Sequence, residues 1–416
     1  MNNTELDENE NENENENKYK KVLNITDLVL SNIGYIVGAG VFVLIGKTLS
    51  IAGNTSWISV ILSGLFIYFI SKSYIKVHNK YLSNDADYLA IKDKYGYIIS
   101  NISIIITLIA NIAITYVVAY GFGSYTNSIT NNKISSFVSS ILGLAIAVII
   151  NIYGIESTAN INNIVTVGGI LGLLLLIVLG GMYLFKHWKT TKLHFKILNI
   201  NDINILNILY GAFIFIFAYF GFDLIIRLNA ESKNNETDIP KALNYSIWIS
   251  IILYTLIILV MIGVYGNNYN NNDNNIGKNL YNPLSILIKK LTNNNIIIKY
   301  IDLCGVALTW NTILLSITHG SRLLTEFANT LDTQQNTLTQ DTDTDTDTDT
   351  HSQYIYNNII MFLKKINSNT QTPIHSIIFI GVCVLFLILI KLNIISSTII
   401  ANASVLLIMI LVYLSS

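Results

Sequence analysis

SNIGYIVGAGVF, residues 31–42, places three glycines inside a segment that is otherwise suited to a membrane helix. Gly34, Gly38 and Gly40 each weaken a helix by about 1 kcal/mol relative to alanine. The residues on either side are apolar enough to enter a bilayer. The stretch therefore predicts a first membrane helix that is either closely packed at its centre or interrupted there.

The composition indicates a polytopic membrane protein. Of 416 residues, 52% are hydrophobic and only 12% are charged, and the mean hydropathy is +0.50. Soluble domains usually carry about 25% charged residues. With a formal net charge of -1, the chain has no basic excess that would favour nucleic acid as a partner. We expect an all-α protein in the lipid bilayer, because backbone groups inside lipid must be paired internally.

Two low-complexity stretches are expected to lie outside the membrane. Residues 1–21 form an acidic tail rich in Asn and Glu, which lacks the apolar core of a cleavable signal peptide. Such a composition buries little apolar area and predicts disorder. A DTDTDTDTDT repeat lies in an expected loop at residues 330–352. The rest of the chain, 22–416, is expected to form one membrane domain.

Apolar runs of the length that a bilayer requires, about 20 residues, recur along this domain. An even number of crossings places both termini on one side, and the basic loop between Lys72 and Lys94 favours the cytoplasm for that side. We therefore expect a multi-pass protein with cytoplasmic N- and C-termini. The ten expected spans are residues 28–48, 56–77, 97–122, 134–153, 161–185, 205–229, 244–266, 298–327, 374–391 and 393–414.

The sixth expected span contains a second interruption. FIFIFAYFGFDLIIRLNAES, residues 213–232, has Gly221 at mid-span, followed by Asp223 and Arg227. The two glycine breaks thus fall in the first helix of each half of the domain. Interrupted helices at matching positions of two halves are a sequence indication of a transporter site.

Such breaks suit a zwitterion such as an amino acid. An unwound helix frees N–H groups that attract an anion and carbonyl groups that attract a cation. The alternative is that the first stretch only serves close packing, because Gly34 and Gly38 match the Gly-x-x-x-Gly pattern of packed membrane helices. The second break favours a site over packing alone.

Several segments, in order and spacing, resemble the amino acid permeases of the amino acid–polyamine–organocation superfamily, with features of the cationic and L-type transporters. Residues 34–44 resemble the first-helix signature of that family, and residues 217–223 resemble its sixth helix. Further similar segments are Asp87-Tyr88, Tyr95-Gly96, Glu231-Ser-Lys-Asn234, Asp238-Ile-Pro-Lys-Ala242, Arg322-Leu-Leu and Thr372-Pro-Ile374.

The resemblance implies a leucine-transporter-type fold with ten transmembrane helices, built as two inverted five-helix repeats with helices 1 and 6 broken. The repeats would cover about 28–185 and 205–414 of the transporter domain. It also implies a substrate carboxylate on the N–H groups of the first break and an ammonium group on carbonyls of both breaks. The implied substrate-binding residues are Ile36, Gly38, Ala39, Gly40, Phe217, Ala218 and Phe220, with Phe217 as an aromatic lid.

Asp223 is the remaining candidate substrate-binding residue. A carboxylate inside a membrane span is by default a functional hypothesis. The favoured interpretation is a self-neutralising pair with Arg227 along the helix, and the alternative is recognition of a cationic substrate side chain. By contrast, Asp302 is expected to be solvated near the outer end of its span, and His319 to be structural.

We therefore expect a secondary transporter of cationic or neutral amino acids that works by alternating access. Proton-coupled relatives often carry a lysine in helix five, where Gly169 aligns here, so a facilitator or exchanger is expected. Asn235 replaces the usual proline of the following loop, which keeps open a non-transporting receptor or regulatory partner; a polyamine transporter is a further alternative. No catalytic or metal-binding pattern appears, so neither an enzyme nor a cofactor is expected, and a homo-oligomer or an accessory subunit is left open.

Overall fold

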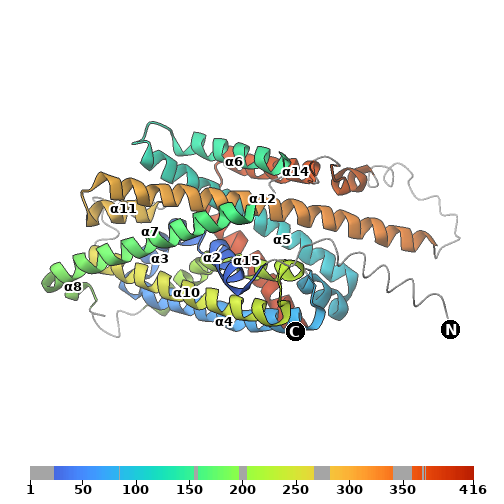
Figure 1. Ribbon diagram of the computed structural model, residues 1–416, viewed down its shortest axis with the longest axis horizontal. Helices are drawn as coiled ribbons and strands as arrows, with labels where there is room; N and C mark the ends of the chain where they lie inside the picture. Colours follow the sequence, from blue (N-terminus) through green and yellow to red (C-terminus); the bar gives the residue numbers. More distant parts are fainter. Residues whose placement is uncertain are drawn as a thin grey trace.

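The computed structural model describes residues 23–83, 85–153, 158–195, 204–266, 282–340, 358–367, 370 and 372–416. These residues form an elongated bundle of helices that run mostly along its long axis (Figure 1). The expected acidic tail, residues 1–21, lies outside the described residues. Helix is found over each range expected to cross the membrane, and the fold is all-α as predicted.

The helices vary widely in length, from the 3 residues of η1 to the 46 of α12. Figure 1 shows α4 and α10 along one side of the bundle, α6 and α14 along the opposite side, and α2 and α15 toward the middle. The bounds are α2 (Ile25–Ile36), α3 (Ala39–Ala52), η1 (Gly53–Thr55), α4 (Ser56–Tyr81), α5 (Ala86–Ile129), α6 (Ser136–Tyr153), α7 (Thr158–Lys186), α8 (Trp188–His194), α9 (Ile205–Phe215), η3 (Ile216–Tyr219), η4 (Phe222–Glu231), α10 (Asn235–Tyr265), α11 (Pro283–Leu291), α12 (Asn295–Gln340), α14 (Ile374–Leu389) and α15 (Ile394–Ser415).

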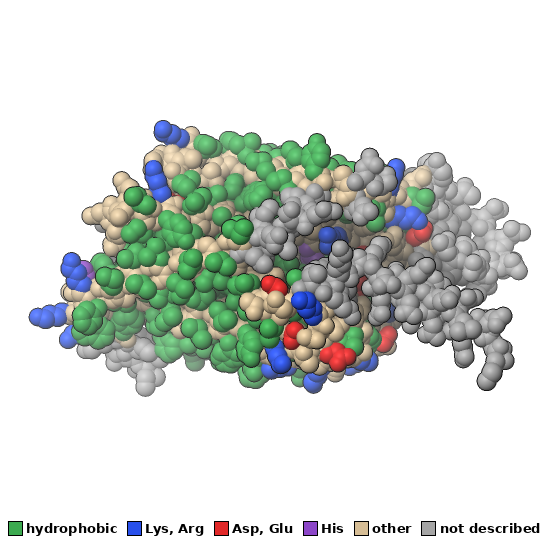
Figure 2. Space-filling view, viewed as in Figure 1, with side chains coloured by type: hydrophobic (Ala, Val, Ile, Leu, Met, Phe, Trp, Pro, Cys, Tyr) green, Lys and Arg blue, Asp and Glu red, His purple; other side chains and the backbone are tan. Residues whose placement is uncertain are grey.

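The outer surface of the bundle suits a bilayer. Within the described residues, 8 helices are long and apolar enough to cross a membrane, and two shorter apolar helices, α2 and α14, accompany them. Figure 2 shows hydrophobic side chains spread over much of the visible face. Large apolar side chains such as Phe185 and Ile98 are 86% and 78% exposed, as expected for residues that face lipid.

The first glycine stretch forms a break between two helices. α2 begins with a capping box of Asn24 and Asp27 and ends at Ile36, and α3 begins at Ala39. A Cβ atom on Gly40 would lie 2.3 Å from the Cα atom of Ala218 in η3. Glycine is therefore needed at position 40 because the backbones of the two broken segments touch there.

The second glycine stretch is also a break, and it changes the type of helix. α9 passes into the short 3₁₀ helix η3, and η4 begins after Gly221, whose φ of 92° is in the left-handed region that favours glycine. η4 is a 3₁₀ helix of 10 residues, which is long for a form usually seen in short pieces. The interruption lies at Gly221 as predicted, but the helix that follows it is a 3₁₀ helix and not an α-helix.

One boundary differs from expectation. α12 continues through Gln340, so residues 330–340 of the expected loop are helical. The remainder of that loop, up to residue 352, lies outside the described residues. The end of α12 is rich in Thr, Asn and Gln, so a prediction from apolar runs alone does not extend the helix this far.

The contact between the two breaks predicts the effect of a single methyl group. We expect Gly40→Ala to destabilise the protein by about 1–3 kcal/mol, because overpacking against backbone atoms leaves no flexible side chain to move aside. Gly181→Ala in α7 is the matched control, since a Cβ atom there would meet no atom within 4 Å. Thermal unfolding of the purified variants in detergent measures the difference. Equal melting temperatures would contradict the close contact.

Candidate functional site

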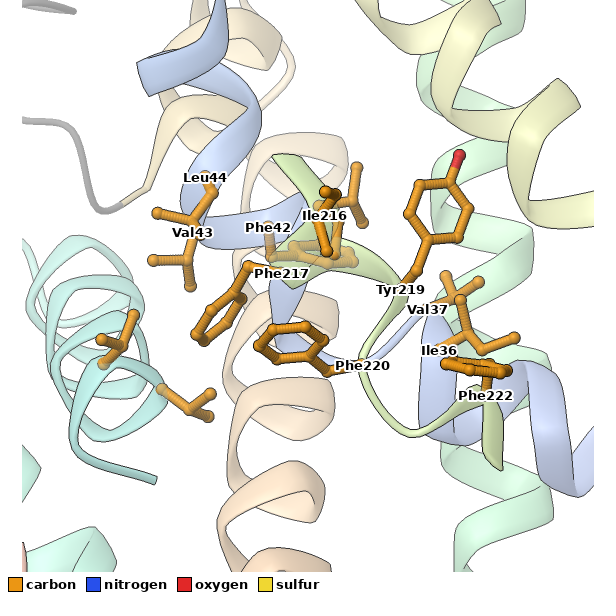
Figure 3. Close-up of a cluster of buried hydrophobic side chains, with 14 of the residues drawn as sticks. Ile36, Val37, Phe42, Val43, Leu44, Ile216, Phe217, Tyr219, Phe220 and Phe222 are labelled. Atoms are coloured by element: carbon orange, nitrogen blue, oxygen red, sulfur yellow. The ribbon is translucent and has the colours of Figure 1, made fainter. Parts of the chain in front are cut away.

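The two broken segments form the centre of the candidate site. Figure 3 shows the α2–α3 break passing beside η3, with the rings of Phe217 and Phe220 on one side and Tyr219 directed away from them. The rings of Phe217 and Phe220 lie 5.2 Å apart, and both residues are buried. The predicted lid residue Phe217 is therefore packed against Phe220.

The first turn of α3 supplies N–H groups. Gly38 is the N-cap residue of α3, and no side chain caps this helix end. The N–H groups at the start of a helix lack partners within the helix, so they attract an anion. Gly38 lies close to α12, because a Cβ atom on it would be 2.3 Å from Oγ1 of Thr312. The predicted carboxylate donors Gly38, Ala39 and Gly40 thus form one helix end that no side chain caps.

A tyrosine that the sequence analysis missed joins the two breaks. The hydroxyl of Tyr254 in α10 donates toward the carbonyl oxygens of Ile36 and Ala218, at 2.9 and 3.0 Å. The N–H group of Phe220 donates to the carbonyl oxygen of Phe217 at 3.2 Å. Three of the four carbonyls expected to meet a substrate ammonium group therefore already have a donor within the protein. In the sequence, Tyr254 and Thr255 are adjacent hydroxyl residues within the aliphatic run of α10, and nothing there distinguishes the tyrosine.

A cavity of about 120 Å³ adjoins the second break. Of the predicted site residues, Phe220 and Asp223 line it, whereas Ile36, Gly38, Gly40, Phe217 and Ala218 do not. Thr312 belongs to its wall and connects it to Gly38. The other lining residues are Tyr35, Tyr74, Thr107, Ala110, Asn111, Ile114, Gly221, Phe222, Leu224, Leu315, Ser316, His319, Val405, Ile408 and Met409.

The favoured interpretation of Asp223 and Arg227 as a pair is wrong. Arg227 instead forms ion pairs with Asp85 and Asp87, at 3.1 and 3.4 Å. Both carboxylates lie at the start of α5. The pairing was inferred from α-helical spacing, but in a 3₁₀ helix with three residues per turn, residues four apart do not stack. Asp223 instead lines the cavity, where His319 also lies.

A second cavity, of about 380 Å³, continues from the first. The two share Thr107 and Ile408 in their walls. The second is lined by the charged residues Asp85, Asp87, Arg227 and Glu326. Three carboxylates against one guanidinium make this cavity negative on balance.

The packing around Asp302 and Gly169 bears on two further expectations. Asp302 is 2% exposed rather than solvated, and its carboxylate accepts a hydrogen bond of 2.9 Å from Ser128. The burial follows from α11, whose Ser285 lies 2.8 Å from the Ser128 hydroxyl and covers this end of α12. At position 169, a Cβ atom would be 2.3 Å from Cδ1 of Leu308, so the space of a longer side chain is already filled.

Metal binding finds no support in the part of the chain that the structure describes. No group of three or more His, Cys, Asp or Glu side chains there is arranged to hold a metal ion. The polar groups at the breaks are backbone groups, hydroxyls and one carboxylate, which bind organic ions by hydrogen bonds and charge.

Comparison with solved structures supports the fold. A manganese transporter of Eremococcus coleocola, in complex with an aromatic bis-isothiourea compound, superposes with a TM-score of 0.53 and 12% sequence identity, covering 96% of this chain and 97% of that one. A point mutant of the same transporter gives 0.54. At this identity the likeness concerns the fold alone.

Curated relatives match over more than half of the chain. An uncharacterised protein of Methanocaldococcus jannaschii is 25% identical over 248 residues, 58% of this chain and 55% of that protein. The branched-chain amino acid permease BcaP of Bacillus subtilis is 24% identical, over 59% of this chain and 55% of its own length. The vacuolar cationic amino acid transporter 4 of Arabidopsis thaliana is 23% identical, over 59% of this chain and 43% of its own length. The match thus spans about half the length of these relatives.

The family model described as amino acid permease matches residues 23–330, which include both breaks and both cavities except the part formed by α15. This family and its named relatives are permeases and transporters rather than enzymes. With most of its length matched by that model, the chain belongs to the amino acid permease family.

Proposed function

We propose that the protein is a secondary transporter of amino acids that works by alternating access. Its transporter domain, 22–416, would cross the membrane ten times as two inverted five-helix repeats, about 28–185 and 205–414. α2 with α3, and α9 with η3 and η4, would be the two broken spans. The family match and the shared transporter fold support this arrangement. Both termini would be cytoplasmic.

The contact between the two breaks is the observation that carries the proposal. The uncapped start of α3 touches η3 at Ala218, so the backbone of one break lies against the backbone of the other. We place the substrate carboxylate on the N–H groups of Gly38, Ala39 and Gly40. The α-ammonium group would bind the carbonyls of Ile36, Phe217, Ala218 and Phe220.

The side chain of the substrate would occupy the smaller cavity. Asp223 lines it, and the nearby guanidinium of Arg227 is committed to two other carboxylates. A carboxylate left in that position favours a basic side chain, such as that of lysine or arginine, over a neutral one. The negative second cavity supports the same preference, and it also favours a polyamine as the second candidate substrate class.

The transport cycle would move the bound amino acid from the smaller cavity into the larger one. Their shared wall at Thr107 and Ile408 marks where α5 and α15 would separate. The packed rings of Phe217 and Phe220 would close the opposite side. Position 169 carries a glycine, packed against Leu308, and so offers no lysine for proton coupling, which supports a facilitator or exchanger.

Transport itself is tested with purified protein in liposomes loaded with unlabelled amino acids. We expect uptake of radiolabelled lysine or arginine that needs neither a proton nor a sodium gradient. Dependence of this uptake on amino acid inside the vesicles indicates an exchanger, and equal uptake into empty vesicles indicates a facilitator. A panel of neutral amino acids and of spermidine, run in parallel, ranks the substrate classes. Binding without flux would support a receptor instead, and neither binding nor flux across the panel would contradict the proposal.

The role of Asp223 is tested by charge removal. We expect Asp223→Asn to weaken lysine uptake at least about ten-fold, because a buried charge pair contributes more than a neutral hydrogen bond, while leucine uptake changes little. Asp93→Asn, at an exposed carboxylate of α5, is the matched control. The KM values of both amino acids are measured for each variant. An equal loss for lysine and leucine would contradict side-chain recognition by Asp223.

A further inference from the structure

Tyr254 lies where the two broken segments and α10 meet, and it is fully buried. Its ring packs edge-on against Phe215 and Tyr219, with centroids 5.5 and 5.3 Å away. This packing leaves the ring little freedom. The hydroxyl is therefore held at a fixed point, 2.9 Å from the carbonyl oxygen of Ile36 and 3.0 Å from that of Ala218.

The two carbonyls belong to different halves of the candidate site. Ile36 ends α2 beside the first break, and Ala218 lies in η3 beside the second. They are separated by far more sequence than a local turn spans, so no local backbone hydrogen bond keeps them together. A single hydroxyl proton shared between them is a direct tie from one break to the other.

The hydroxyl of Tyr254 contacts these carbonyls without being part of the cavity wall. It does not line the cavity of about 120 Å³. A carbonyl oxygen has two acceptor lone pairs, so a hydroxyl that uses one leaves the other for a ligand. The hydrogen bonds from Tyr254 thus leave each carbonyl one acceptor lone pair for a ligand.

We propose that Tyr254 is a positioning residue that orients the carbonyls of Ile36 and Ala218 toward a protonated α-amino group. This inference rests on the proposed function, because it concerns the same site. An ammonium group has three donors and can bind two carbonyls at once, whereas a hydroxyl has one. Tyr254 therefore sets the preference for a 2-amino acid over the corresponding 2-hydroxy acid.

The same aromatic cluster offers a matched control. Tyr219 is also fully buried, and its ring contacts that of Tyr254. Within the described part of the chain, however, its hydroxyl has no hydrogen-bond partner. Tyr254→Phe and Tyr219→Phe therefore remove the same atom from neighbouring rings, and only the first removes a tie between the breaks.

The experiment measures equilibrium binding to purified protein in detergent, which does not require transport. The ligands are lysine and leucine and, for each, the acid in which a hydroxyl replaces the α-amino group. We expect Tyr254→Phe to weaken binding of both amino acids about ten-fold, as for loss of a buried hydrogen bond. Binding of the hydroxy acids should change less, so the preference for the amino group narrows. Tyr219→Phe should keep the wild-type affinities and the wild-type preference.

Other outcomes have separate meanings. Equal weakening of amino and hydroxy acids by Tyr254→Phe, or the same loss in Tyr219→Phe, would overturn the inference, because either result indicates packing alone. If Tyr254→Phe lowers the yield, binding per folded molecule in the monodisperse fraction still decides the matter. Amino acid binding by the wild type without flux in liposomes would contradict transport but not the role of Tyr254. No binding of either amino acid by the wild type would contradict both.

Discussion

Backbone groups that leave a helix inside a membrane protein need partners, and this need governs the centre of the structure. Lipid offers no hydrogen bonds, so unwound backbone is tolerated only where protein or a polar cavity surrounds it. The breaks after α2 and α9 meet this condition by lying against each other, with Gly40 in contact with Ala218. The hydroxyl of Tyr254 satisfies one carbonyl from each. The N–H groups at the start of α3, which no side chain caps, are those assigned to the substrate.

Charged side chains lie at two distances from this centre. Asp223 lies at the smaller cavity, next to the break, and the cluster of Asp85, Asp87, Arg227 and Glu326 lines the larger cavity beyond it. The ion pairs of Arg227 also connect η4, the segment that follows the second break, to Asp85 and Asp87 at the start of α5. A movement of η4 would therefore change the larger cavity and the substrate site together, as alternating access requires.

Both breaks could be predicted from the sequence, because glycine weakens a helix through its own backbone and needs no knowledge of neighbours. The positions of the helical spans could also be predicted from the sequence, because a helix that crosses lipid requires a long apolar run. The ion pairs of Arg227 could not be, because they depend on η4 being a 3₁₀ helix and on the start of α5, more than a hundred residues earlier. The same holds for Tyr254, whose role depends on where α10 packs, and for Asp302, which α11 covers.

The central claim is that an amino acid binds with its carboxylate on one break and its ammonium group on both. The most direct measurement is an experimental structure of the protein with bound lysine. We predict carboxylate oxygens within hydrogen-bonding distance of the N–H groups of Gly38 to Gly40, the ammonium group at the carbonyl of Ile36, and the side chain directed to Asp223. Lysine held in the larger cavity alone, or with its carboxylate away from the start of α3, would contradict the account.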